Sequence, residues 1–308
     1  MAITASMVKE LREMTGAGMM DCKKALAATE GDMDKAIEFL REKGLAAAEK
    51  KAGRIAAEGI VMTKVSEDGK KAAIVEVNSE TDFVAKNEKF RDYVSAVADQ
   101  ALATSAADID AFLAETWLAD PSKTVKEELS SQIAIIGENM NIRRFEQVTA
   151  PDGFVESYIH GGGRIGILVE MATENVCEAA HEAAKNVAMQ IAAMYPKHVT
   201  VDEVPADYIA HEREILKAQA MNENTGKPEN IIEKMIEGRL KKELKEICLV
   251  DQIYVKDSDM TVGKYLESVS KEIGAPLTVK RFVRYETGEG LEKKSDNFAE
   301  EVAKQAGM

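Results

Sequence analysis

The chain contains an internal repeat that is found when the sequence is shifted by 94 residues without a gap. In each copy, two runs rich in β-branched residues flank a glycine-containing turn, and an alanine-rich helical pattern follows. The superposed identical residues include Gly59 and Gly153, Val61 and Val155, Gly69 and Gly163, Val75 and Val169, Glu76 and Glu170, and Glu80 and Glu174. Such a repeat predicts duplicated α+β core subdomains with antiparallel sheets.

Both copies place the same elements in the same order. In the first, residues 59–77 predict a hairpin that turns at Asp68 and Gly69, and residues 86–103 predict an amphipathic helix. In the second, residues 153–171 predict a hairpin, and a helix follows to about residue 194. The inward face of the first helix is expected to consist of Phe90, Tyr93, Val94 and Val97. Because the identities are few, a chance match is the alternative to duplication.

Short helices precede the first copy. Thr4 and Asp32 are candidate N-caps for two of them. Helices this short are only marginally stable alone, so we expect them to pack as a three-helix bundle that resembles a ubiquitin-associated domain, which is a docking module. The predicted helices cover residues 5–14, 19–30 and 31–44, and an alanine-rich connecting helix over residues 46–59 is expected to end near Gly59.

The second copy is interrupted by two helical segments within residues 206–244. Both carry apolar stripes, and the helix breaker NTGKP separates them, which is typical of an antiparallel helical hairpin or coiled coil. An exposed stripe here is predicted to bind either a partner or a second copy of the chain. Residues 248–255 and 277–288 predict strands around a helix capped by Thr261, and residues 290–305 predict a short C-terminal helix.

These elements divide the chain into successive parts. A chain of 308 residues is long enough for about two domains, each with its own core. The expected parts are a helical domain with its connecting helix at 1–58, a first core subdomain at 59–150, a second core subdomain at 151–205 and 245–288, the inserted hairpin at 206–244, and a C-terminal module at 289–308.

Charge and composition narrow the functional classes. A formal net charge of −14 argues against nucleic-acid binding, which requires clustered Lys and Arg. No apolar run approaches the roughly 18–20 residues of a membrane span, and the N-terminus lacks the pattern of a signal or transit peptide. The three cysteines form no CxxC pair and the four histidines show no metal-ligand spacing, so we expect no metal and no cofactor. The sequence therefore predicts a soluble cytoplasmic protein.

Glu76, Glu80, Asp82 and His160 are the residues that acid/base catalysis would use. No nucleophile motif accompanies them, because the chain has no G-x-S-x-G, no Cys/His arrangement and no P-loop. The glycines at 161–163 resemble a phosphate-binding loop, but they lie between predicted strands and not before a helix, so a hairpin turn is the better interpretation. Catalysis is therefore the less favoured hypothesis, and we expect the protein not to be an enzyme.

The segment SETDFVAK places an aromatic residue beside a carboxylate where a strand turns into a helix. One interpretation makes Phe83 part of the core, with Thr81 or Asp82 as the helix cap. The other makes Phe83 an exposed wedge that enters a partner's pocket. The repeat favours the second, because Val176 and Cys177 stand at the equivalent positions and the shared fold therefore does not require an Asp-Phe pair.

Several segments resemble signatures of the bacterial elongation factor Ts family, in the order that the family has them. The first is LREMTGAGMMDCKKAL at residues 11–26, and the second contains TDFVAK at residues 81–86. Further segments are IGENMNIRR at 136–144, YIHGGGRIG at 158–166 and GEGLEKKSDNFAEEVA at 288–303. The resemblance extends over essentially the whole chain.

The resemblance implies a guanine-nucleotide exchange factor that binds elongation factor Tu and speeds the loss of its GDP. It implies that Asp82 and Phe83, between Thr81 and Val84, intrude near the partner's magnesium and displace elements that hold metal and phosphates. It also implies a 1:1 or 2:2 complex, with a possible homodimer through the hairpin at 206–244. The other implied contacts are His160, Arg12, Met19, Met20 and, in the tail helix, Phe298.

A docking scaffold or chaperone-like adaptor that uses the N-terminal bundle is the second hypothesis. Such a protein would bind its partner with an affinity that does not depend on nucleotide. An exchange factor instead binds the nucleotide-free partner best, because the coupling between nucleotide and factor is reciprocal.

Overall fold

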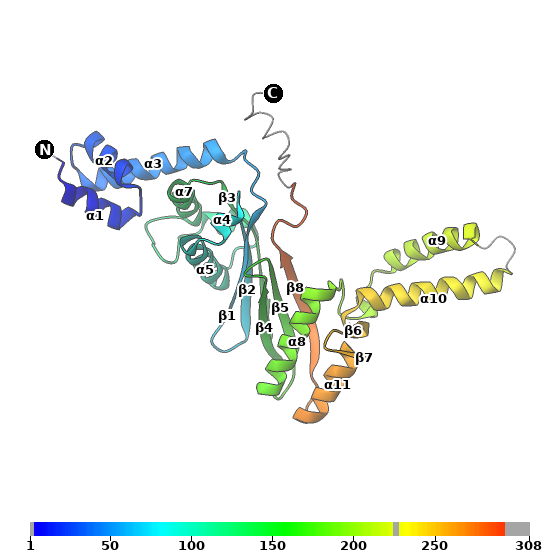
Figure 1. Cartoon of the computed structure of the whole chain (residues 1–308). Helices are drawn as coiled ribbons and strands as arrows, with labels where there is room; N and C mark the ends of the chain where they lie inside the picture. The colour runs from blue at the N-terminus through cyan, green and yellow to red at the C-terminus, as the bar shows by residue number, and fades with distance from the viewer. Residues whose placement is uncertain (1–2, 224–227, 293–308) are drawn as a thin grey trace.

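The structure is a computed structural model that describes residues 3–223 and 228–292. The molecule is elongated (Figure 1). A helical bundle lies at its N-terminal end, antiparallel sheets with their helices form the middle, and a pair of long helices projects on the other side. The fold is of the α+β class, as the repeat predicts.

The N-terminal bundle consists of α1 (Ala5–Thr15), α2 (Met19–Ala28) and α3 (Met33–Lys51). Both predicted caps are present, since the Thr4 hydroxyl accepts a hydrogen bond from a backbone amide of α1 and the Asp32 carboxylate accepts one from α3. The bundle has a small core of its own, made of Val8, Leu11, Cys22, Ala25, Leu26 and Ala36. The predicted three-helix bundle is therefore confirmed.

The separate connecting helix predicted over residues 46–59 is wrong. α3 runs without a break from the bundle to Lys51, and residues 52–57 form a turn and an extended link to the first strand. Gly44, where the break was expected, is buried inside the helix, and a Cβ at this position would lie 3.7 Å from the backbone oxygen of Ser130 in α7 (Val125–Ile136). Packing against α7 thus compensates for the low helix propensity of glycine.

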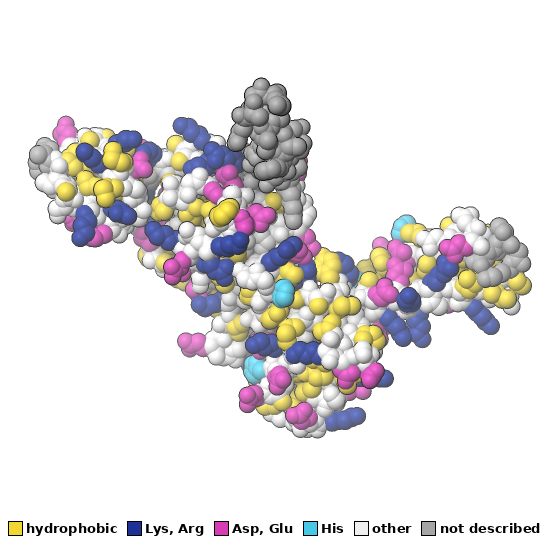
Figure 2. Space-filling model, in the orientation of Figure 1, with side chains coloured by type: hydrophobic (Ala, Val, Ile, Leu, Met, Phe, Trp, Pro, Cys, Tyr) yellow, Lys and Arg dark blue, Asp and Glu magenta, His cyan; other side chains and the backbone are white. Residues whose placement is uncertain are grey.

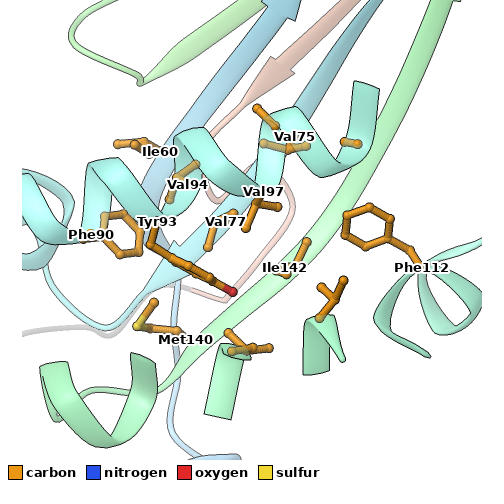
Figure 3. Close-up of a cluster of buried hydrophobic side chains, with 14 of the residues drawn as sticks. Ile60, Val75, Val77, Phe90, Tyr93, Val94, Val97, Phe112, Met140 and Ile142 are labelled. Carbon is orange, nitrogen blue, oxygen red and sulfur yellow. The ribbon is translucent and has the colours of Figure 1, made fainter. Parts of the chain in front are cut away.

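The first sheet consists of β1 (Glu58–Val65), β2 (Lys71–Ser79) and β3 (Met140–Thr149), in that order. β1 and β2 form the predicted hairpin, whose turn contains Gly69 with a φ of +69°. α5 (Glu88–Ala103) packs on this sheet. Its predicted inward face lies in the core drawn in Figure 3, where Phe90, Tyr93, Val94 and Val97 are buried.

Residues 104–150, for which the sequence patterns predict no element, form α6 (Ile109–Ala114), α7 and β3. α7 begins with a capping box, in which Thr124 and Glu127 each bond the other's backbone amide. α6, α7 and β3 contribute further side chains to the first core, and Phe112 and Ile142 are among the residues that they bury (Figure 3).

The second sheet consists of β4 (Gly153–His160), β5 (Ile165–Ala172) and β8 (Thr278–Glu286), in that order. β4 and β5 are the predicted hairpin, and α8 (Glu178–Met194) is the predicted helix after it. α11 (Val262–Ile273) is capped by Thr261, as predicted, and packs against α8. The arrangement of the first sheet, a hairpin with a third strand and a covering helix, is therefore repeated.

The two sheets also share their register. In the first hairpin Gly59 lies opposite Asn78, and in the second Gly153 lies opposite Ala172, so both partners are displaced by the 94 residues of the repeat. The third strands add the same irregularity, a β-bulge after Glu76 and after its equivalent in the second sheet. Because a bulge is a specific structural feature, this agreement favours duplication over a chance match.

A common core joins the two sheets to each other. The Val61 amide donates to the Gly163 carbonyl at 2.7 Å, and the Val155 amide donates to the Gly69 carbonyl at 2.8 Å. The repeat superposes these two bonds, so each hairpin holds the turn of the other. The buried residues shared between the sheets are Val61, Ala72, Ile74, Val148, Ala150, Val155, Leu168, Val283 and Tyr285.

α9 (Ala206–Glu223) and α10 (Glu229–Ile247) form the predicted helical hairpin and lie side by side in Figure 1. A short 3-10 helix, η1 (Val201–Glu203), precedes them. Their contact is a narrow apolar seam whose buried residues are Leu216, Ala220, Ile236 and Leu240. The hairpin therefore has little core of its own, as its stripes predict.

The strand predicted over residues 248–255 is largely wrong. Leu249–Asp251 form the 3-10 helix η2, and only β6 (Ile253–Tyr254) belongs to a strand, paired with β7 (Asp257–Thr261). The Leu249 amide donates to the backbone oxygen of His198 at 2.9 Å. The segment thus pairs with the loop after α8 and buries its consecutive apolar residues there, which an apolar run in the sequence does not distinguish from a strand.

Some predictions from composition can be compared with the described residues. No helix among them is long and apolar enough to cross a membrane. They contain no group of three or more His, Cys, Asp or Glu side chains arranged for a metal ion. Cys22, Cys177 and Cys248 are free thiols. The predicted C-terminal helix with Phe298 lies outside the described residues, and the domain boundaries stay predictions.

Candidate functional site

α4 (Asp82–Ala85) is a single helical turn that follows β2 and carries Phe83. The Thr81 hydroxyl caps it by accepting a hydrogen bond from the Val84 amide at 3.4 Å. Val84 and Ala85 pack against the first core, whereas the Phe83 side chain is 81% exposed. The turn thus buries its smaller apolar residues and presents its largest one to solvent.

The core interpretation of Phe83 is therefore wrong, although its assignment of Thr81 as a cap is correct. Burial of an aromatic ring contributes roughly 1.5–3 kcal/mol, and in the free chain Phe83 obtains little of this stabilisation. An exposed aromatic side chain on an ordered turn fits the wedge interpretation, in which a partner supplies the burial.

Two glutamates fasten α4 to the loop that precedes β3. Glu138 accepts hydrogen bonds from the Thr81 amide at 3.0 Å and from the Thr81 hydroxyl at 2.6 Å. Glu80 accepts one from the Asn139 amide at 2.6 Å. Because these bonds connect residues far apart in the chain, they hold the helical turn that carries Phe83 in a fixed position. The sequence patterns do not identify Glu138 or Asn139, although both lie in the segment IGENMNIRR.

Asp82 forms an ion pair with Lys86 on the surface of α4, with 2.6 Å between the charged atoms. The hydrogen bond from Lys86 lowers the pKa of the Asp82 carboxyl below its ordinary value, so the side chain is ionised at neutral pH. Exposed pairs of this kind stabilise a fold very little. Asp82 is therefore free to exchange Lys86 for a charge on a binding partner.

The second copy of the repeat has no counterpart of α4 within its described residues. Residues 173–177 contain no helix, and α8 begins at Glu178. Cys177 occupies the N-cap position but makes no side-chain capping bond, and Val176 is exposed. The Asp-Phe pair and its helical turn thus belong to one copy only, as the repeat predicts.

His160 ends β4 and opens the turn that faces β1. Its side chain is exposed, and its Nδ1 lies 3.1 Å from the Tyr158 hydroxyl. The turn is held by the bond from Val61 described above and by Arg91 of α5, which donates to the Gly162 carbonyl at 2.8 Å. α4 also contacts β1 and α5. β1 and α5 therefore contact both α4 and the turn that follows His160.

The turn itself is a hairpin turn, as interpreted from the sequence. Its three glycines have φ values of +59°, +69° and +111°, which other residues rarely adopt. A Cβ on Gly163 would lie 2.8 Å from the Ile60 side chain, so the close approach of the turn to β1 also requires glycine.

The four residues considered for acid/base catalysis do not form one group. Glu76 is fully buried and paired with two arginines, Glu80 bonds the loop before β3, Asp82 pairs with Lys86, and His160 contacts Tyr158. None of the hydrogen bonds found in the described part of the chain joins two of the four. The geometry therefore gives the catalytic hypothesis no support.

The predicted N-terminal contacts lie on a different surface. Arg12 on α1 and Met19 and Met20 on α2 are exposed, and Met14 beside them is 60% exposed. Figure 2 shows apolar side chains gathered on this bundle among charged ones, and Figure 1 places the bundle apart from α4. We refer to these four residues as the N-terminal patch, and to residues 81–84 with His160 as the core patch.

Comparison with known proteins assigns the chain to a family. A sequence profile of the family described as Elongation factor TS matches residues 80–289. The chain belongs to this family. It is 57% identical to Elongation factor Ts of Clostridium novyi (strain NT) over 303 residues, which cover 98% of each chain. It is also 57% identical to that of Clostridium perfringens (strain SM101 / Type A) over 305 residues and 56% identical to that of Clostridioides difficile (strain 630) over 303 residues, which cover 99% and 98% of each chain.

Membership of the elongation factor Ts family makes this chain a nucleotide exchange factor of translation elongation. The match begins at Glu80, one residue before the Thr81 cap, and ends at Glu289, three residues after β8. It therefore includes the core patch, β3 and the whole second sheet, whereas β1 and β2 precede it.

Proposed function

We propose that this chain binds the GDP form of elongation factor Tu and speeds GDP release by inserting Phe83 near the partner's magnesium and phosphate site. The observation that supports the proposal is the exposure of Phe83 on a braced helical turn, in a chain of the elongation factor Ts family. Asp82 is assigned a polar contact beside the metal.

Nucleotide exchange requires no bond chemistry and hence no catalytic group. The factor must bind the nucleotide-free partner more tightly than the GDP-bound partner, and GDP then weakens the binding of the factor by the same ratio. Magnesium is often the largest local charge at a phosphate site. A side chain that displaces the ligands of the magnesium therefore lowers the binding energy of the nucleotide by more than the burial of the ring contributes.

The hydrogen bonds that hold α4 in place are suited to a side chain that inserts into a partner. Burial of the Phe83 ring contributes roughly 1.5–3 kcal/mol at an interface, enough for a binding hot spot. Because Glu138 already fixes Thr81 through two hydrogen bonds, little conformational entropy is lost when the turn binds. The free chain thus presents Phe83 in an ordered position before the partner arrives.

Further contacts complete the proposed complex. His160 makes a second contact from the core patch, and the N-terminal patch of Arg12, Met14, Met19 and Met20 binds the partner's nucleotide domain. The hairpin of α9 and α10 binds either the partner or a second copy of this chain, which corresponds to a 1:1 or a 2:2 complex.

The test compares Phe83→Ala with the unmodified chain in stopped-flow release of a fluorescent GDP from elongation factor Tu. We expect release to slow by about 10- to 100-fold, the range for loss of a hot-spot side chain. Val176→Ala, at the neighbouring position of the second copy, is the matched control and should leave the rate unchanged. Release at the wild-type rate with Phe83→Ala would show that the wedge assignment is wrong.

The alternative is a docking adaptor that binds through the exposed N-terminal patch. It predicts that the affinity for elongation factor Tu is the same with and without excess GDP. The proposed exchange function predicts weaker binding when GDP is added, so titration calorimetry under the two conditions separates them.

A further inference from the structure

The exchange function proposed above leaves the buried carboxylate of Glu76 without a role. This residue lies in β2 and is fully buried. Its oxygens accept hydrogen bonds from Arg144 Nε at 2.6 Å, Arg143 Nη1 at 3.0 Å, Asn78 Nδ2 at 3.1 Å and the Gly288 amide at 2.8 Å. A buried carboxylate requires such partners, and breaking one of these pairs is costly.

The same two arginines reach residues 286–289, which begin at the last residue of β8 and which we call the C-terminal strap. Arg143 Nη2 donates to the Glu289 carbonyl at 2.6 Å, and Arg144 Nη2 donates to the Glu286 carbonyl at 3.3 Å. Gly288 has a φ of +70°, and a Cβ there would lie 2.1 Å from the backbone oxygen of Ala57. The strap continues β8 of the second sheet, but its hydrogen bonds attach it to residues of the first sheet.

The strap also holds the turn that His160 opens. The Thr287 amide donates to the Arg164 carbonyl at 2.9 Å, and its hydroxyl donates to the Gly163 carbonyl at 3.1 Å. Hydrogen bonds thus connect Glu76 to the strap, and others connect the strap to this turn. In the other direction β2 continues from Glu76 into the residues that carry α4.

The second copy does not build this cluster. Glu170, the equivalent of Glu76, is only partly buried, and no ion pair to it is found in the described part of the chain. Arg281, which lies opposite it as Arg144 lies opposite Glu76, pairs with Glu146 of the first sheet instead. The buried cluster therefore accompanies the copy that carries α4 and is not required by the shared fold.

We propose that Glu76 is a positioning residue, which together with Arg143 and Arg144 holds the C-terminal strap and thereby fixes the spacing between Phe83 and His160. The proposal rests on the exchange function proposed above, because it concerns how the two contacts of the core patch engage the partner. If the spacing changes, the factor still meets its partner, but the two contacts no longer fit the nucleotide site at the same time.

The first test uses the free chain and the variant Glu76→Gln, which keeps the shape of the side chain and removes its charge. We expect amide hydrogen exchange in residues 161–166 and 286–289 to become at least about tenfold faster, because the strap and the turn open locally. Exchange in α8 and α11 should not change. Glu170→Gln is the matched control and should leave both segments as they are.

Uniformly faster exchange throughout the chain, or no change at all, would overturn the positioning role. If Glu76→Gln does not fold, Thr287→Val removes the strap's hydroxyl bond to the turn and leaves the buried charges in place. This variant should speed exchange in residues 161–166, and unchanged protection there would likewise count against the proposal.

The second test measures GDP release against the concentration of the factor. With Glu76→Gln the maximal rate should fall by at least about tenfold, as for a misplaced reacting group, while the half-saturating concentration changes less than about threefold. In the Glu76→Gln chain, the additional change His160→Ala should slow release by a smaller factor than His160→Ala does in the otherwise unmodified chain. The reason is that the two residues act through one turn.

The two proposals fail in different ways. If the unmodified chain does not accelerate release, the exchange function is wrong, and hydrogen exchange of the free chain still reports whether Glu76 holds the strap. If the unmodified chain accelerates release and Glu76→Gln reaches the same maximal rate, the positioning role is wrong and the exchange function stands.

Discussion

The two copies of the repeat share one backbone plan and differ in what each adds to it. Both have the same hairpin register and the same bulge, and each bonds the turn of the other. The first copy adds α4 and the buried cluster around Glu76, and the second adds the hairpin of α9 and α10. What is common serves the fold, so what is confined to one copy is the better candidate for function.

Two phenylalanines of the first copy separate these roles. Phe90 is fully buried, whereas Phe83 is 81% exposed. Phe90→Ala should lower the free energy of unfolding by about 3–5 kcal/mol through the cavity it leaves, and Phe83→Ala should lower it by less than about 0.5 kcal/mol. Urea unfolding followed by circular dichroism measures both values. A loss of about 3 kcal/mol in Phe83→Ala would mean that Phe83 belongs to the core, and the contrast between the copies would then not hold.

The helices that follow the two hairpins begin differently, and this difference predicts changes of opposite sign. Thr81 caps α4, and Thr81→Ala should cost about 1–2 kcal/mol because it also removes a bond to Glu138. Cys177 begins α8 without a capping bond, so Cys177→Ser should stabilise the chain by about 0.5–1 kcal/mol. Urea unfolding of the two variants checks both signs. Destabilisation by Cys177→Ser would mean that its packing against the second core outweighs the cap.

Much of the fold can be predicted because its signals are local. The two hairpins, the helices α5 and α8, and the caps Thr4, Asp32 and Thr261 follow from alternation, helical periodicity and turn residues within short windows. The repeat adds a comparison between distant windows, and the shared register of the sheets agrees with it.

Features that depend on distant contacts are not predicted. Pairing of β3 with β2 joins segments separated by the whole of α5, α6 and α7, and no local pattern encodes it. The continuity of α3 through Gly44 depends on packing against α7. In each case tertiary contact overrides the local preference.

The candidate site shows the same division. The exposure of Phe83 could be inferred only by comparing the copies, because a single helical turn is too short for its apolar pattern to show which side faces the core. The supports of the site are contacts between distant segments, namely Glu138 with Thr81 and Arg143 and Arg144 with Glu76. Those residue types are common on any protein surface, so their roles are visible only in the structure.

The smallest predicted effect concerns two carboxyls whose pKa values shift in opposite directions. Burial raises the pKa of Glu170, and Lys280 offsets this only in part. Burial also acts to raise the pKa of Glu289 in the C-terminal strap, but the Tyr195 hydroxyl, at 2.5 Å, and Arg144 together lower it below its ordinary value of 4.5. Folding thus favours the neutral form of Glu170 and the ionised form of Glu289.

The sign of each mutational effect follows from these directions. The stabilisation from Glu289 is present above its unfolded pKa and is lost as the pH falls through its lower folded pKa, so Glu289→Gln should destabilise the chain at pH 7 but not in acid. Glu170→Gln removes a charge that the fold disfavours, so it should stabilise the chain at pH 7, and this gain should vanish once the unmodified carboxyl is protonated. Each effect should amount to a few tenths of a kcal/mol after solvent screening. Urea unfolding at a series of pH values measures them, and equal signs at pH 7 would show that the C-terminal strap does not hold its carboxylate differently from the second sheet.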